Sequence, residues 1–394
     1  MICAHKIALD LTTSQEAYCR RAAGTARFTY NWALAEWQRQ YQAGEKPTTQ
    51  KLKAQWNALK RTGFPWVTAV HKDANQQPFT HLATAFQKFF RREAQYPTFK
   101  KRGQHDSFYV SNDKCVFQGR RLRLPVLGWV RMREELRFAG QVLSLTISRT
   151  AQRWYASVAV RVDDAPTTSE NQAVVGVDLG VLRLATLSTG ETVEGPKPLR
   201  RLLKALKRCA VSVARKVKGS ANRCKARAKL ARLHARIAFQ RADSLHKLTT
   251  DLVCRFGTVV IEDLHVKGMV RNHRLARAIS DMGFGLCRQL LTYKAERAGV
   301  RLVVADRWFP SSKTCSQCGG LHGALTLKDR VFQCDDCGFV ADRDLNAAIN
   351  LRQLPTAGGE ITPVDIVALT AVSDCRETVV VEAGTTNSAF VHTL

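Results

Sequence analysis

The sequence predicts a multidomain α+β protein, from its length and from two changes in the pattern of apolar residues. The chain has 394 residues, more than one ordinary domain and enough for two or three. Apolar residues recur at helical spacing up to about residue 95 and then alternate with a period of two. A continuous apolar, β-branched run begins at Ala173, as expected for a central strand of a new domain.

The N-terminal part predicts a β-rich unit that carries a helical insertion. Residues 1–11 and 96–165 contain short alternating strands with turn signals between them, which indicates a small barrel. Residues 12–95 indicate helices, inserted between the first strand and the others. The polar segment 166–172 is the predicted linker to the next domain.

Three details of the helical insertion can be predicted. Ser14 is the expected cap of its first helix, and its third helix is expected from Thr80 to Ala94, after a break at Pro78. The aromatic stripe that contains Phe28 and Trp32 is interpreted as a buried helix face rather than a surface for base stacking.

The second part predicts an α/β domain over residues 173–309 and 339–354, interrupted by a cysteine-rich segment at 310–338. A single helix of the domain is expected from Ala278 to Arg297. Residues 355–394 are nearly free of basic side chains and are interpreted as a peripheral or disordered tail.

The composition indicates a polyanionic partner. The formal net charge is +28, which is typical of nucleic-acid binding, and the segment from Lys197 to Arg255 is opposed only by Asp243 and Asp251. Gly219-Ser220 divides this segment into two predicted helices. The candidate phosphate contacts are Lys204, Lys207, Arg208, Arg215, Lys216, Lys218, Arg223 and Lys225, with Lys100, Lys101 and Arg102 in the first part.

Four of the twelve cysteines predict a structural zinc site. Cys315, Cys318, Cys334 and Cys337 form two C-x-x-C pairs, and a glycine, Gly319 or Gly338, follows each pair. Four thiolates at this spacing suit tetrahedral Zn²⁺, and a glycine after the second cysteine allows the positive φ of the turn. The other eight cysteines are interpreted as packing thiols of a protein from a reducing compartment.

Three acids predict a catalytic site for divalent cations. Asp178 and Glu262 end apolar strands, and Asp344 opens an apolar helix. A buried carboxylate is costly unless it is paired or metal-bound, and two Mg²⁺ ions need several carboxylate oxygens. The order strand-Asp, strand-Glu, helix-Asp is typical of RNase H-like nuclease domains. Asp342 is the alternative to Asp344, and Asp263 is a further neighbouring acid.

The motifs together resemble the TnpB family, the OrfB-type proteins of bacterial insertion sequences, which are similar to compact type V CRISPR nucleases. The resemblance rests on G-V-D-L-G, I-E-D-L, the C-x-x-C pairs and D-R-D-L-N-A-A, with R-F-T-Y-N-W-A-L and Y-P-T-F-K-K-R-G-Q-H-D-S-F in the first part. It implies a RuvC-type nuclease domain with an inserted zinc ribbon, a wedge-like β-barrel and a helical recognition unit.

The resemblance further implies an RNA-guided DNA endonuclease. Its guide RNA would come from the end of the element, and it would cut double-stranded DNA beside a short flanking motif. No helix-turn-helix or finger array is recognised in the sequence, and the basic charge binds nucleic acid without reading its sequence. Recognition of the target sequence by base pairing with an RNA is consistent with both observations. Two alternatives stay open: a transposase that acts by strand transfer, and a non-catalytic nucleic-acid-binding regulator.

The expected location is the cytoplasm of a bacterium or archaeon, in association with the nucleoid. The sequence has no apolar run long enough to span a membrane and begins with no signal peptide, so no membrane partner is expected.

Overall fold

The computed structural model describes residues 2–162, 171–323, 325–326 and 329–354. The chain forms two compact units, Met1–Asp163 and Asp164–Leu394, and each is described by itself. Most of the predicted linker and the whole predicted tail lie outside the described residues. No helix in the described ranges combines the length and the apolar character needed to cross a membrane.

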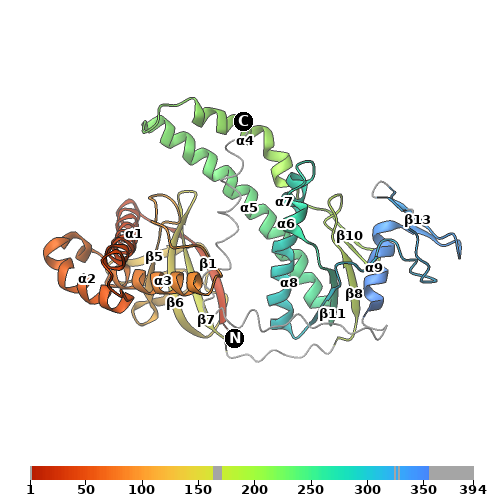
Figure 1. Cartoon of the computed structure of the whole chain (residues 1–394), viewed down its shortest axis with the longest axis horizontal. Helices are drawn as coiled ribbons and strands as arrows, with labels where there is room; N and C mark the ends of the chain where they lie inside the picture. The colour runs from red at the N-terminus through yellow and green to blue at the C-terminus, as the bar shows by residue number, and fades with distance from the viewer. Residues whose placement is uncertain (1, 163–170, 324, 327–328, 355–394) are drawn as a thin grey trace. The chain divides into compact units, whose positions relative to one another are not determined.

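The first unit contains a seven-stranded antiparallel sheet in which the first strand of the chain lies centrally (Figure 1). The order is β2-β6-β7-β1-β5-β4-β3. The predicted barrel would require the edge strands β2 and β3 to meet, and it stays a prediction. The strands are β1 (Ile2–Asp10), β2 (Ser107–Ser111), β3 (Val116–Gln118), β4 (Arg121–Leu124), β5 (Gly128–Met132), β6 (Gln141–Thr150) and β7 (Arg153–Arg161).

Helices are inserted between β1 and β2, and their aromatic side chains form a separate core. Trp56 is fully buried at its centre, and the ring of Trp32 lies 4.9 Å from it. The rings of Phe28 and Phe64 are 5.1 Å apart in the same cluster. Phe28 and Trp32 are half-buried and pack against this core, which confirms that the aromatic stripe faces the interior of the helical insertion. The elements are α1 (Thr13–Gln42), α2 (Thr49–Gly63), the 3-10 turn η1 (Pro65–Ala69) and α3 (Asp73–Phe90).

Three predicted helix limits in the first unit are wrong. Thr12, not Ser14, caps α1, because its hydroxyl accepts from the N–H of Gln15, whose side chain accepts from the N–H of Thr12 in return. The third helix begins at Asp73 rather than Thr80, ends at Phe90 rather than Ala94, and contains Pro78. Pro78 is buried within α3, where it cannot donate the helical hydrogen bond that other residues make.

The second unit is built on a mixed five-stranded sheet with the order β10-β9-β8-β11-β12. The strands β8, β11 and β12 are parallel, while β9 and β10 are antiparallel to their neighbours. Both faces of the parallel strands are buried, as their apolar runs predict. The strands are β8 (Val174–Asp178), β9 (Ala185–Leu187), β10 (Thr192–Val193), β11 (Thr258–Glu262) and β12 (Arg301–Ala305).

Helices cover both faces of this sheet (Figure 1). Helices α5 and α8 pack on one face through one apolar cluster, and α9 packs on the other through a second. The predicted single helix from Ala278 to Arg297 is wrong, because Gly283 adopts a φ of +74° and separates α7 from α8. The helices are α4 (Pro198–Ala214), α5 (Ala221–Arg255), α6 (Val266–Met269), α7 (Ala276–Met282), α8 (Phe284–Ala298) and α9 (Arg343–Gln353).

A cysteine module, defined here as residues 310–338, lies between β12 and α9 in the chain. Its strand β13 (Val331–Gln333) pairs with β14 (Val340–Asp342), which leads directly into α9. The position of the start of α9 therefore depends on the module.

Candidate active site and metal centre

Two of the predicted acids end neighbouring parallel strands. The register of β8 and β11 places Asp178 beside Glu262 at the same edge of the sheet. Because side chains alternate across a strand, Asp178 shares its face with Gly176, and Glu262 shares its face with Val260. Gly176 and Val260 pack against α9. Asp178 and Glu262 therefore lie on the face of the sheet that α9 covers.

Helix α9 brings the third acid because it packs closely on β8. A Cβ atom at Gly176 would lie only 2.0 Å from the carbonyl oxygen of Ala348 in α9. Asp344 lies in the first turn of this helix. Burial, and then the negative charges of Glu262 and Asp344, raise the pKa of Asp178 to about 8. The three acids therefore interact with one another electrostatically.

This donor set suits hard divalent cations, which bind carboxylate oxygens and compensate their mutual repulsion. The ligand atoms of the three acids do not all lie within 4.8 Å of one another. Within the described ranges, groups of three or more possible ligands that are this close occur in the cysteine module. Carboxylates that are spread more widely fit two ions about 4 Å apart better than one compact cage.

The two acids of D-R-D differ in their contacts. One carboxylate oxygen of Asp342 accepts from the N–H groups of Asp344 and Leu345, at 3.0 and 3.2 Å, and so caps α9. Its other oxygen lies 3.1 Å from the guanidinium of Arg183. Both oxygens of Asp342 are thus engaged in holding the start of α9.

Asp263, the acid after Glu262, is also engaged. Its two carboxylate oxygens pair with Arg288 and with Arg307. Burial of Asp263 opposes ionisation, but these hydrogen bonds outweigh it, and the pKa of Asp263 is lowered. Asp263 therefore fits a structural role beside the acid site.

Sequence reasoning missed the polar side chains that attach the cysteine module to α9. Asn346 and Asn350 are buried on α9, and the side-chain amide of each donates to the carbonyl oxygen of Thr314 at 2.7 Å. The amide of Asn350 also donates to the carbonyl oxygen of Ser311 at 2.7 Å, and the hydroxyl of Ser311 donates to Glu262. The available signal was the pair of asparagines, four residues apart, among apolar residues of a helix.

The four predicted cysteines converge, and their sulfur atoms all lie within 4.8 Å of one another. The Sγ atoms of Cys315 and Cys337 are 3.7 Å apart, and those of Cys318 and Cys334 are 3.5 Å apart. A tetrahedral ion with metal–sulfur bonds of about 2.3 Å requires separations of about 3.8 Å. The cluster therefore fits one tetrahedral metal ion.

The turns of the cluster have the predicted geometry. Gly319 and Gly338 have φ values of +78° and +72°. Their N–H groups donate to the carbonyl oxygens of the first cysteine of each pair, at 2.9 and 3.0 Å. His322, which sequence reasoning did not select, also contacts the cluster, with Nε2 3.2 Å from the sulfur of Cys334.

Three family models match parts of the chain. The family model described as "Probable transposase" matches residues 157–273, the one described as "Cas12f1-like, TNB domain" matches residues 284–351, and the one described as "Helix-turn-helix domain" matches residues 1–46. A protein of Streptomyces pristinaespiralis, named as a proposed RNA-guided DNA endonuclease, is 39% identical over 351 residues, which cover 86% of each chain. This chain belongs to the TnpB/OrfB_IS605 family.

Other relatives of this TnpB-family chain extend the comparison. InsQ of Escherichia coli (strain K12), also named as a proposed RNA-guided DNA endonuclease, is 35% identical over 88% of this chain and 91% of its own. The solved structure of a Cas12f1–sgRNA–target DNA complex contains a chain with a TM-score of 0.53 and 13% identity, covering 87% of this chain and 83% of that one. This structural likeness concerns the fold.

The family model described as a helix-turn-helix domain matches residues 1–46, where the sequence predicts no such motif. The structure agrees with the prediction from the sequence, because residues 2–42 form the strand β1 followed by a single helix of 30 residues, α1. In this TnpB-family chain, the matched segment contains no turn between two short helices.

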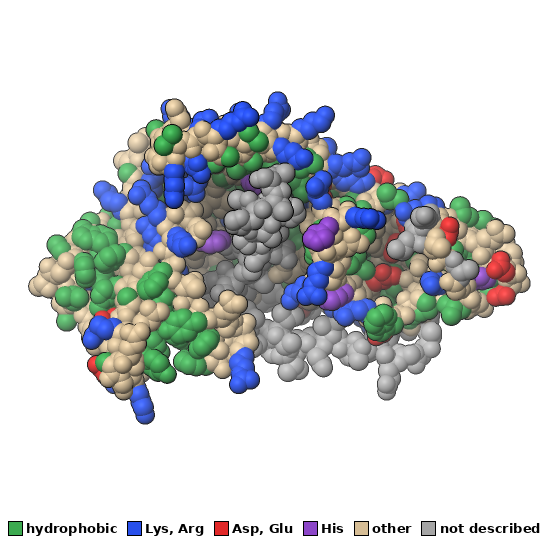
Figure 2. All heavy atoms as spheres, turned by 45° about the horizontal axis from the view of Figure 1, so that its top comes forward, with side chains coloured by type: hydrophobic (Ala, Val, Ile, Leu, Met, Phe, Trp, Pro, Cys, Tyr) green, Lys and Arg blue, Asp and Glu red, His purple; other side chains and the backbone are tan. Residues whose placement is uncertain are grey.

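The predicted basic surface of the TnpB-family chain lies on the hairpin of α4 and α5. Figure 2 shows Lys and Arg side chains gathered over this hairpin. The carboxylate of Asp281, a buried side chain of α7, accepts from the N–H groups of Leu199 and Arg200 and so fixes the start of α4. The hairpin is thereby anchored to the α/β core.

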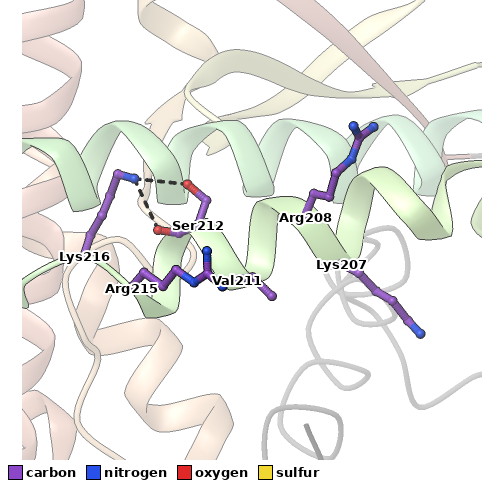
Figure 3. Close-up of a pocket in the computed structure, with 6 residues that line it drawn as sticks. All are labelled: Lys207, Arg208, Val211, Ser212, Arg215 and Lys216. Carbon is purple, nitrogen blue, oxygen red and sulfur yellow. Dashed lines mark hydrogen bonds between the residues drawn. The ribbon is translucent and has the colours of Figure 1, made fainter.

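The predicted phosphate contacts on the hairpin fall into two groups. Exposed side chains are those of Lys204, Lys207, Arg208, Arg215, Lys218 and Lys225. Lys216 instead turns back to Ser212, with its Nζ 3.1 Å from the hydroxyl (Figure 3). Arg223 donates to the carbonyl oxygen of Lys216 at 2.7 Å and so closes the hairpin. Lys216 and Arg223, two of the predicted phosphate contacts, are therefore engaged in hydrogen bonds within the hairpin.

The three basic residues of the first unit also differ from one another. The side chain of Asn31 exchanges two hydrogen bonds with the backbone of Lys100, at 2.8 and 2.9 Å, and Nζ of Lys100 lies 4.1 Å from the ring centroid of Tyr30. Lys101 and Arg102 are exposed. Lys100 thus joins the two N-terminal sequence motifs, while its two neighbours stay candidates for phosphate contact.

Proposed function

We propose that this protein is an RNA-guided DNA endonuclease that hydrolyses phosphodiester bonds of target DNA. The observation that carries the proposal is the position of Asp178, Glu262 and Asp344, at the ends of adjacent strands and at the start of the helix that covers them. The names of the relatives from Streptomyces pristinaespiralis and Escherichia coli support the same activity.

The three acids are proposed to hold two Mg²⁺ ions. Such an ion pair supplies an activated water for attack on phosphorus and stabilises the oxygen that leaves. Asp178 must lose its proton to bind a cation, so its raised pKa makes protons and cations compete for this side chain. Asp342 keeps the first turn of α9 formed, and Asp344 is thereby presented to the site.

The finer fold assignments belong to the same proposal. Residues 173–309 and 339–354 would form an RNase H-like (RuvC) domain, and the cysteine module would be a zinc ribbon with one structural Zn²⁺. Residues 1–11 and 96–165 would form a wedge-like barrel, with 12–95 as the recognition insertion. The sheet order of the second unit, the spacing of the sulfur atoms and the fold shared with Cas12f1 support these assignments.

The proposed partners are a guide RNA from the end of the mobile element and double-stranded DNA with a short flanking motif. The exposed cations of the α4–α5 hairpin suit phosphate contacts, which give affinity without sequence information. Sequence choice would then come from base pairing between the RNA and one DNA strand. The solved Cas12f1 complex contains both an sgRNA and target DNA.

The test compares RNA-free protein with protein loaded with this RNA, on plasmids that carry a complementary site, in Mg²⁺ and physiological salt. We expect cuts only with the RNA, at a position that moves when the guide segment is changed. Equal cutting by RNA-free protein would refute guidance. Joined rather than hydrolysed ends would indicate a strand-transfer transposase, and binding without any cutting would indicate a regulator.

A matched pair of variants tests the choice within D-R-D. Asp344→Asn removes a charged ligand while preserving shape, and it should abolish cutting but retain nucleic-acid binding. Asp342→Ser removes the same charge but keeps a good helix cap, so it should cut at close to the normal rate. The reverse result would show that Asp342 is the ligand.

A further inference from the structure

The hydroxyl of Ser311 connects the cysteine module to the acid site. It donates a hydrogen bond to Oε1 of Glu262, the acid that ends β11. Ser311 is only 4% exposed, so the donor of this bond is shielded from water. In contrast, the hydroxyl of the neighbouring Ser312 makes no hydrogen bond within the described residues.

Ser311 is itself held from the other side. The buried amide of Asn350 donates to the carbonyl oxygen of Ser311, and its backbone belongs to α9, the helix that begins with Asp344. The N–H of Ser311 donates to the carbonyl oxygen of Phe309 at 2.8 Å, so its backbone is fixed at both polar groups. One chain of hydrogen bonds therefore runs from α9 through Asn350 and Ser311 to Glu262.

A donor to one carboxylate oxygen restricts the rotation of the whole group. With Oε1 of Glu262 held by Ser311, the orientation of Oε2 is fixed as well, and that oxygen stays available to a cation. Groups that orient metal ligands in this way change metal affinity without touching the metal.

We propose that Ser311 is a positioning residue for Glu262, and that Asn350 sets the position of Ser311 relative to the helix that carries Asp344. The cysteine module would then have a second role besides binding its own metal. Its first residues would fix the position of Glu262 on β11 relative to Asp344 on α9. This inference rests on the proposed nuclease function, because it treats Glu262 as a cation ligand.

The expected effect is on cation affinity. Loss of a ligand-orienting hydrogen bond typically weakens metal binding by about 10- to 100-fold. Ser311→Ala should therefore weaken binding at the acid site by at least about 10-fold and raise the Mg²⁺ concentration for half-maximal cutting similarly. Ser311→Thr retains the hydroxyl and should recover most of the affinity.

The experiment measures Mn²⁺ binding to the zinc-loaded protein by electron paramagnetic resonance, with Ser312→Ala as the matched control. Wild type and Ser312→Ala should bind with equal affinity, and Asp178→Ala should lose this binding. Zinc content and melting temperature are measured for every variant. Wild-type protein that binds no Mn²⁺ and does not cut would refute the nuclease function itself.

The positioning role has its own refutation. If wild type binds Mn²⁺ and Ser311→Ala binds equally well with an unchanged Mg²⁺ requirement, Ser311 does not position Glu262. Asn350→Ala extends the test, because residues that act through one chain of contacts have non-additive effects. The double variant should therefore bind Mn²⁺ about as weakly as the weaker single variant. Fully additive losses would refute the connection between Asn350 and Ser311.

Discussion

Replacement of Gly176 by alanine should separate α9 from the sheet. The new Cβ atom would lie 2.0 Å from the carbonyl oxygen of Ala348, 2.6 Å from the backbone nitrogen of Arg352 and 3.0 Å from Cβ of Leu351. Two of these three atoms belong to the backbone of a helix, so no side-chain rotation removes the collision. To reach ordinary contact distances, β8 and α9 must move apart by more than about 1 Å.

The cost follows from this geometry. Overpacking a core costs about 1–3 kcal/mol, and collision with backbone places Gly176→Ala at the upper end, about 3 kcal/mol. For a domain of 150–250 residues, that corresponds to a melting temperature lowered by about 6–12 °C. The shift also moves Asp344 away from Asp178 and Glu262, and a misplacement of about 1 Å can reduce the rate of cutting about 100-fold.

The assay combines calorimetry, Mn²⁺ binding and guided cutting. Gly24→Ala is the matched control, because Gly24 lies within α1 and a Cβ atom there would meet only the end of the Arg27 side chain, at 3.9 Å. That substitution should be neutral or stabilise by up to about 1 kcal/mol. If Gly176→Ala changes the melting temperature by less than about 2 °C, the close packing of α9 on β8 does not hold Asp344 in place.

Three further results are expected. In Mg²⁺-free buffer without chelator, Asp178→Asn should be more stable than wild type, and the difference should grow from about pH 4 to pH 8. The pKa of Asp178 is about 8 in the folded state and about 3.9 in the unfolded state. Over this range the unfolded state of wild type loses its proton first, so the free energy of unfolding of wild type falls as the pH rises. Elemental analysis should find one Zn²⁺ per chain, and Cys334→Ser should lose it together with cutting, because the module leads into α9; zinc-free, fully active protein would contradict this. Joint replacement of Lys207 and Arg208 by alanine should lower the slope of log affinity against log salt by about one for each phosphate that these side chains bind, and an unchanged slope would place the nucleic acid elsewhere.

The parts of the site that sequence predicted are those set by local chemistry. The C-x-x-C spacing and the following glycines determine a knuckle within a few residues, and Gly319 and Gly338 adopt the expected positive φ. A carboxylate at the end of an apolar strand is also a local signal, because burying it is costly unless it is paired or metal-bound. Asp178 and Glu262 could therefore be selected before any pairing of strands was known.

The remaining parts depend on contacts between distant residues. The roles of Ser311, Asn350 and Asp281 come from partners that only the folded chain brings near. Conversely, Arg223 has the side chain of a phosphate contact, but it donates to the carbonyl oxygen of Lys216 within the α4–α5 hairpin. Predicted helix limits were wrong where a helix-breaking residue can either interrupt a helix or lie within it. Pro78 lies within α3, whereas Gly283 separates α7 from α8.

During translation, Asp344 is the last of the three acids to leave the ribosome, because β8 and β11 precede the cysteine module and α9 follows it. A nascent chain that has already exposed the basic hairpin still lacks the helix that covers β8. Such a chain has the charge expected to bind polyanions but only two of the three acids. If the proposed role of Asp344 holds, truncated products that stop within the cysteine module should bind nucleic acid without cutting it, and only chains whose synthesis has passed Asp344 should cut.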